Sequence, residues 1–340
     1  MSRLVIHIGT HKTATTSIQR FLKNNQGVLA ERGVYYPDYS LIGKTPHYAH
    51  LGMVNALSGQ HRVYTSREAE KFFGKVVERS KDFDTTIISG EPFYRHVGEG
   101  SYDRVPTNRD EYWESRRAYV ARLRQLFGAA EIVVVFRRQA DYAQSLYQEH
   151  VKVTRYKKNF LKFLEEFWYH FAFNAQATLW DEYFPGLRAL EFDRLTRGGD
   201  AVREFCRLLA LPISGLSAAE TYNESLPPDL VVIKRVLHRT RASKDDLRDQ
   251  MQRMLKALPE TSFARISPRS FFASNADQLE FQKSFDFDNE ELKRFMHADD
   301  DSNAPFFSSD FKKVKFYGDR LHPDILGSLV DMAIGPTAKL

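Results

Sequence analysis

The chain has few of the features that whole classes of protein depend on. Its 340 residues include one cysteine, Cys206, so no intrachain disulfide and no cysteine-based metal cluster can form. No stretch approaches the roughly 20 apolar residues of a membrane span, and the apolar run near residue 1 is too short for a signal peptide. We therefore expect a cytoplasmic protein without a membrane span.

Charge of one sign is not in large excess either. The chain has 49 Lys and Arg against 44 Asp and Glu, a formal net charge of +5 that is spread along its length. Nucleic-acid binding calls for a concentrated basic face, so we expect no nucleic-acid partner. The small positive excess suits a smaller anionic ligand.

Short apolar runs alternate with helical periodicity over the first two thirds of the chain. This alternation predicts an α/β fold with a mostly parallel sheet flanked by helices, P-loop-like in its opening strand, loop and helix. We expect a single domain over residues 1–340, in which the polar segment 265–311 forms an irregular excursion or a cap. The predicted strands are residues 3–8, 85–89, 131–136 and 187–192.

The most informative segment lies between the first predicted strand and the first predicted helix. There the backbone N–H groups and the positive end of the helix dipole form an anion site at the carboxyl edge of the sheet. One threonine would be enough to cap the helix, whereas this loop has four threonines and a lysine. We predict a phosphate-binding loop made of Gly9, Thr10, His11, Lys12, Thr13, Ala14, Thr15 and Thr16.

The loop lacks the G-x-x-x-x-G-K-[ST] spacing of a Walker A motif. Lys12 comes three residues after Gly9, and no glycine precedes it directly. An ATPase or GTPase is therefore disfavoured. Two alternatives remain open: an ATP-dependent small-molecule kinase with an atypical loop, and a non-catalytic nucleotide-binding module.

A second pair of phosphate-binding residue types follows the third predicted strand. Arg137 ends that strand, and Ser145 lies eight residues later inside the next predicted helix. Arginine offers a rigid fork of donors and serine adds a hydroxyl. Alone, the pair would be a surface arginine and a solvated serine, but beside the first loop it predicts a second phosphate site.

These segments resemble a family, the sulfotransferases that use 3′-phosphoadenosine 5′-phosphosulfate (PAPS), in its bacterial and glycan-type branches. Lys12–Thr16 resembles the family's K-[TS]-G-T-[TS] loop, and Arg137–Ser145 resembles R-[DR]-P-x-x-[RY]-x-x-S. Less specific likenesses are found in Trp180–Leu195 and Asn223–Leu226. Ala14 replaces the usual glycine, so the backbone there must tolerate a Cβ atom close to the phosphosulfate. Gln139 replaces a common proline but leaves the Arg-to-Ser spacing intact.

The resemblance implies transfer of a sulfuryl group from PAPS to a hydroxyl of a small-molecule or glycan acceptor. We expect a carbohydrate or a glycosylated small molecule as acceptor, 3′-phosphoadenosine 5′-phosphate (PAP) as product, and no metal. Lys12 would neutralise the charge that builds on the leaving phosphate. The 5′-phosphate would be held by Thr13 to Thr16, and the 3′-phosphate by Arg137 and Ser145. The oligomeric state stays open.

The acceptor hydroxyl needs a base, and two residues are candidates. Glu91 follows the second predicted strand at the same sheet edge, where apolar neighbours would raise the pKa of its carboxyl group. His11, inside the loop, is the alternative. His7, in the first strand, is expected to be a core histidine. Helical spacing likewise places most aromatic rings between Lys152 and Phe173 in the core, with the basic residues before them as a possible acceptor rim.

Overall fold

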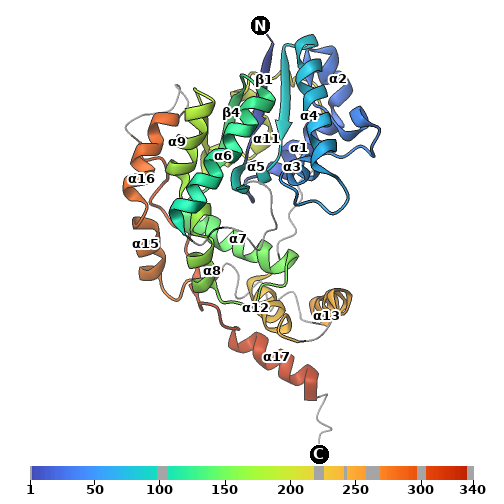
Figure 1. Ribbon diagram of the computed structural model, residues 1–340. Helices are drawn as coiled ribbons and strands as arrows, with labels where there is room; N and C mark the ends of the chain where they lie inside the picture. The colour runs from blue at the N-terminus through green and yellow to red at the C-terminus, as the bar shows by residue number, and fades with distance from the viewer. Residues whose placement is uncertain are drawn as a thin grey trace, which may run out of the picture. The chain divides into compact units, whose positions relative to one another are not determined.

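The computed structural model describes residues 2–97, 106, 108–217, 226–240, 243–257, 269–296 and 304–334 (Figure 1). The chain forms two compact units. The sheet unit comprises Met1–Arg138, Ala172–Tyr222 and Phe287–Phe307, and the helical unit comprises Gln139–Phe171, Asn223–Asp286 and Ser308–Leu340. The expectation of a single domain stays a prediction.

The sheet unit is built on a five-stranded parallel sheet in the order β2-β3-β1-β4-β5. The predicted α/β class is confirmed, and the four predicted strands correspond to β1, β3, β4 and β5. The fifth strand, β2, has two residues, too few to give a period in the sequence. The strands are β1 (Arg3–His7), β2 (Val34–Tyr35), β3 (Thr85–Ser89), β4 (Glu131–Phe136) and β5 (Arg188–Glu191).

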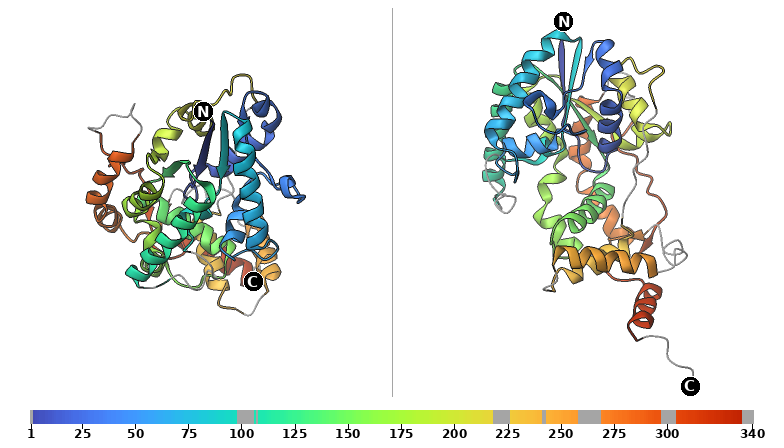
Figure 2. Two further views of the ribbon diagram at one scale, coloured as in Figure 1. Left: turned by 45° about the horizontal axis from the view of Figure 1, so that its top comes forward. Right: turned by 90° about the vertical axis from the view of Figure 1, so that its right-hand side faces the viewer.

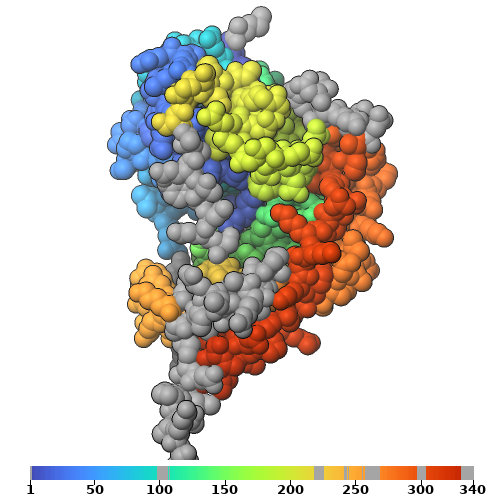
Figure 3. Space-filling model, turned by 180° about the vertical axis from the view of Figure 1, so that it is seen from behind, coloured from blue at the N-terminus to red at the C-terminus, as the bar shows by residue number. Residues whose placement is uncertain are grey.

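One face of this sheet is covered by α1 (Thr15–Asn24), α2 (Gln26–Glu31), α10 (Phe192–Thr196) and α11 (Ala201–Leu208). Alternate strand residues point into this layer because the side-chain period of a strand is two. Cys206 is part of this core as a small buried hydrophobic residue. The yellow-green surface in Figure 3 includes the outer side of α10 and α11.

The other face is covered by helices rich in aromatic residues. The right-hand view of Figure 2 shows α4 on this side of the sheet, with α1 and α11 opposite. The ring of Phe136, the last residue of β4, stacks on Phe173 with a centroid distance of 4.4 Å. The helices of this layer are α3 (Leu51–Leu57), α4 (Ser66–Arg79), α5 (Pro92–Arg95), α6 (Arg109–Phe127) and α9 (Phe173–Tyr183).

The helical unit packs around its own aromatic cluster. The Tyr147 ring lies 5.3 Å from those of Phe160 and Phe163, centroid to centroid, and 5.1 Å from that of Phe271. Phe160 and Phe163 are buried, as the helical spacing predicted. The elements are α7 (Gln139–Val153), α8 (Phe160–Glu166), α12 (Pro228–Leu237), α13 (Lys244–Ala257), β6 (Arg269–Ser270), α15 (Asn275–Lys283), β7 (Lys315–Phe316) and α17 (Pro323–Ile334).

Of the segment 265–311, the structure describes residues 269–296 and 304–311. They hold β6 and α15, followed by α16 (Asp286–Glu291) and a 3₁₀ turn at Leu292–Phe295. That the segment forms a cap stays a prediction.

A buried ion pair links distant parts of the helical unit. The Arg269 guanidinium lies 2.5 Å from Asp229 Oδ1, and both side chains are almost completely buried. Arg269 also donates to the carbonyl oxygens of Gly318 and Arg320, and Asp229 Oδ1 accepts the His322 amide. The pair therefore joins α12 and β6 to the chain that follows β7.

Removal of one partner should destabilise this unit strongly. Arg269→Met would leave the Asp229 carboxylate buried without its counter-charge, at a cost of about 3–5 kcal/mol in the free energy of unfolding. Chemical denaturation measures this change. Arg203→Ala on α11, which breaks an exposed pair with Asp200, is the control and should have little effect. Equal effects of the two substitutions would contradict this account.

Candidate functional site

The loop after β1 turns twice through left-handed backbone. Lys12 has φ 66° and Ala14 has φ 60°, both in the region that favours glycine. Ala14 is also the residue directly before α1. Alternation of left- and right-handed residues turns successive N–H groups toward one side, which is the backbone arrangement of an anion-binding concavity.

Side chains within the loop fix this conformation. Thr10 Oγ1 donates to the carbonyl oxygen of Val135 in β4 at 2.8 Å, and Thr13 Oγ1 donates to the Thr10 carbonyl oxygen at 2.7 Å. These two hydroxyl hydrogens are therefore used inside the protein. Thr15 Oγ1 lies 3.4 Å from both Thr13 Oγ1 and the Thr10 carbonyl oxygen. Of the four threonines, Thr16 is the most exposed, and its side chain is half-buried.

No side chain of the described residues caps the start of α1. The first N–H groups of a helix have no partner within the helix, and a side chain usually accepts from them. Here the residue at the cap position is Ala14, which has no acceptor. Half-buried Lys12 lies two residues before it. Uncapped donors, the helix dipole and a lysine together favour an anion at this position.

Gly9 is required by the packing of His7. A Cβ atom at residue 9 would lie 2.8 Å from His7 Nε2, closer than such contacts allow. The His7 ring cannot easily move, because Nδ1 lies 2.9 Å from Ser89 Oγ and the ring packs on Phe205. His7 is a core residue, as predicted, but its Nε2 atom has no hydrogen-bond partner among the residues that the structure describes. Burial lowers the pKa of His7 to about 3, so the ring is neutral.

Ser89, the last residue of β3, is held by side chains from two further elements. Gln19 of α1 directs its amide nitrogen to Ser89 Oγ at 3.1 Å. His50 accepts the Ser89 N–H at Nδ1 and donates from Nε2 to the Pro37 carbonyl oxygen at 2.7 Å. These partners require the neutral form of His50, and burial lowers its pKa to about 4.

Glu91 lies two residues beyond Ser89 and directly precedes α5. Its Oε2 atom lies 3.4 Å from the Gln19 amide nitrogen. Burial raises the pKa of the Glu91 carboxyl group, while the hydrogen bond from its own backbone N–H, the Gln19 hydrogen bond and the Arg95 charge lower it. The raised pKa agrees with the expectation from the sequence. A carboxylate in this state can accept a proton.

The remaining predicted residues are distributed over both units. His11 is half-buried in the loop. Burial is the largest cause that lowers the pKa of His96, and the His11 charge adds to it. Arg137 follows β4, with its guanidinium 5.4 Å from the centre of the Phe192 ring. Ser145 lies in α7 of the helical unit. A shared phosphate site for Arg137 and Ser145 stays a prediction. Of Asn223–Leu226, residues 223–225 lie outside the described residues.

Sequence reasoning missed Gln19, Ser89 and His50 as parts of this site. A signal for Gln19 was available, because it is a polar residue on the apolar side of α1, between Ile18 and Phe21. Its partners are 70 and 72 residues away in the chain, so no local pattern could identify them.

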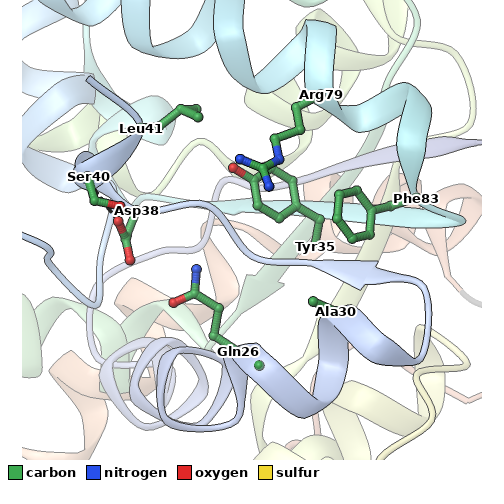
Figure 4. A pocket seen from close by; sticks show the side chains of 9 residues that line it. Gln26, Ala30, Tyr35, Asp38, Ser40, Leu41, Arg79 and Phe83 are labelled. Atoms are coloured by element: carbon green, nitrogen blue, oxygen red, sulfur yellow. Dashed lines mark hydrogen bonds between the residues drawn. The ribbon is translucent and has the colours of Figure 1, made fainter. Parts of the chain in front are cut away.

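Two cavities in the sheet unit are lined by residues outside the loop. One, of about 570 Å³, is shown in Figure 4. Arg79 lies over the Tyr35 ring there, and Tyr35 stacks on Phe83 with 4.8 Å between centroids. The other, of about 810 Å³, is lined by β5, α10 and α11, where Arg203 pairs with Asp200 and Arg207 with Glu204. None of the predicted site residues lines either cavity.

In comparisons with known proteins, no family model and no curated protein matches the chain. A crystal structure of a sulfotransferase from Alicyclobacillus acidocaldarius is similar to this chain with a TM-score of 0.42 and 14% sequence identity. The likeness covers 73% of this chain and 99% of that one.

The described part of the chain contains no helix that is both long and apolar enough to span a membrane. It also contains no group of three or more His, Cys, Asp or Glu side chains placed to hold a metal ion.

The left-handed backbone at Ala14 predicts the effect of glycine there. Ala14→Gly removes a conformational cost of about 1 kcal/mol per non-glycine residue in this region, offset in part by the greater freedom of glycine in the unfolded chain. We expect a free energy of unfolding equal to or above that of the wild type, measured by urea denaturation. The matched variant Gly9→Ala should be clearly destabilised by its contact with His7. If Ala14→Gly is the less stable of the two, the loop conformation is wrong.

The buried histidine also predicts a dependence of stability on pH. The pKa of His7 is about 3 in the folded protein and 6.5 in its ordinary state, so below pH 6.5 protons bind preferentially to the unfolded chain. Stability is then lost as pH falls, by up to about 1.4 kcal/mol per pH unit from this residue. His7→Asn keeps a donor near Ser89 but does not titrate. Its unfolding free energy should decline less steeply between pH 6 and pH 4, and parallel declines would contradict the assignment.

Proposed function

We propose that this chain is a sulfotransferase that moves a sulfuryl group from PAPS to a hydroxyl acceptor. The observation that carries the proposal is the uncapped start of α1, preceded by Lys12, at the carboxyl edge of a parallel sheet. This is where nucleotide phosphates bind in open α/β sheets. The loop is too short for a Walker A motif, and a phosphosulfate needs fewer contacts than a triphosphate.

In the proposed reaction the acceptor oxygen attacks sulfur, and the bond from sulfur to the 5′-phosphate oxygen breaks. The electron pair of that bond leaves with PAP. Lys12 and the N–H groups at the start of α1 stabilise the charge on the departing phosphate. Glu91 takes the acceptor proton, and the raised pKa of its carboxyl group supports this role.

Arg137 is proposed to bind the 3′-phosphate of the donor. Arginine forms two parallel hydrogen bonds with a phosphate, and the Phe192 ring beside the guanidinium restricts its orientation. Ser145 is proposed as a second ligand from its spacing in the sequence alone. We further propose a carbohydrate or a glycosylated small molecule as acceptor.

Loss of the Lys12 charge should slow transfer without unfolding the protein. Removal of one such stabilising contact costs about 3 kcal/mol in the barrier, roughly a 100-fold loss of rate. Transfer of the labelled sulfuryl group from PAPS to a panel of simple glycosides measures the rate, and circular dichroism reports the fold. Lys71→Ala, an exposed lysine on α4, is the control. Wild-type rates in Lys12→Ala would show that this mechanism is wrong.

The donor class is tested separately by calorimetric titration with PAP and with ATP plus Mg²⁺. We expect PAP to bind and ATP with Mg²⁺ not to bind. Binding of Mg-ATP alone would favour a kinase. A non-catalytic binding module would be favoured if PAP bound, no acceptor received a sulfuryl group, and Glu91→Gln left the binding of PAP unchanged.

A further inference from the structure

Gln19 lies where α1 meets the end of β3, and its side chain is 1% exposed. The amide nitrogen is 3.1 Å from Ser89 Oγ and 3.4 Å from Glu91 Oε2. The Ser89 carbonyl oxygen also lies 3.4 Å from this nitrogen. All three acceptors belong to the segment that ends β3 and leads into α5. One buried amide therefore contacts the strand end and the candidate base together.

We propose that Gln19 is a positioning residue that holds the Glu91 carboxylate in fixed register with the start of α1. The inference rests on the proposed function, in which Glu91 accepts the acceptor proton. Gln19 lies one helical turn after Thr15, so the helix whose first turn is proposed to bind the donor phosphate also carries the group that orients the base. The distance between donor and base is then set by one rigid element.

The hydrogen bond has a direction, since an amide N–H can only donate and only the ionised carboxyl group offers both oxygens as acceptors. Gln19 therefore stabilises the charged form of Glu91. The other ionisable groups that act on or near Glu91 are Arg95 of α5 and Tyr36 after β2. His7 and His50 contact Ser89 and are neutral.

A merely structural role for Gln19 makes a different prediction. If its amide served only Ser89, its replacement would lower stability and leave the protonation of Glu91 unchanged. Ser89 Oγ would still have His7 as a partner. The protonation equilibrium of Glu91 thus separates the two roles.

The experiment is a carbon-13 NMR titration of the Glu91 carboxyl group, assigned by its loss in Glu91→Gln. Gln19→Met keeps the side-chain length and removes the donor. We expect the pKa of Glu91 to rise by about 0.5–1 unit. Gln26→Met is the matched control, because Gln26 bonds Lys23 and should leave the pKa of Glu91 unchanged. An unchanged pKa in Gln19→Met overturns the proposal.

Calorimetry with PAP keeps the two hypotheses apart. Gln19→Met should bind PAP as the wild type does, because Gln19 has no assigned role at the phosphates. If the wild type fails to bind PAP, the proposed function fails, while the titration still reports whether Gln19 controls the carboxyl group. Where transfer is measurable, the acidic limb of its pH profile should move upward with the pKa in Gln19→Met.

Discussion

The carboxyl end of β3 is held at Ser89 by three side chains from three other parts of the sheet unit. His7 comes from β1, Gln19 from α1 and His50 from the residue before α3. All three are buried, and both histidines are neutral because charging them there would cost solvation energy. The place of Glu91, two residues further on, depends on this arrangement.

The same arrangement fixes the loop. The His7 ring occupies the space that a side chain at residue 9 would need, so only glycine fits there. The loop then turns through left-handed backbone at Lys12 and Ala14. Thr10 then ties the loop to β4, the neighbouring strand. The same packing contacts therefore hold the strand ends, the loop and the candidate base in place.

The sequence predicted those parts of this structure that are local. β1, the loop and α1 are contiguous, so an apolar run, a Gly-Thr-rich turn and a helical period identified them together. β2 was not predicted, because two residues show no alternation and because its place at the sheet edge depends on pairing with β3. The contact of Gln19 with Glu91 was not predicted, because it joins residues that are 72 positions apart in the chain. The division into two units also has no marker, since no linker-like composition separates Arg138 from Gln139.

Ala14 has a backbone conformation that is usually found at glycine. A motif that requires glycine at this position describes the commonest way to reach a left-handed turn, rather than the turn itself. This chain reaches φ 60° with alanine, since the packing around the loop holds the conformation that alanine alone would disfavour. A sequence motif with glycine at this position does not match this chain. The backbone torsion angles of β1, the loop and α1 would still match. Backbone torsions are therefore the better basis on which to collect its relatives.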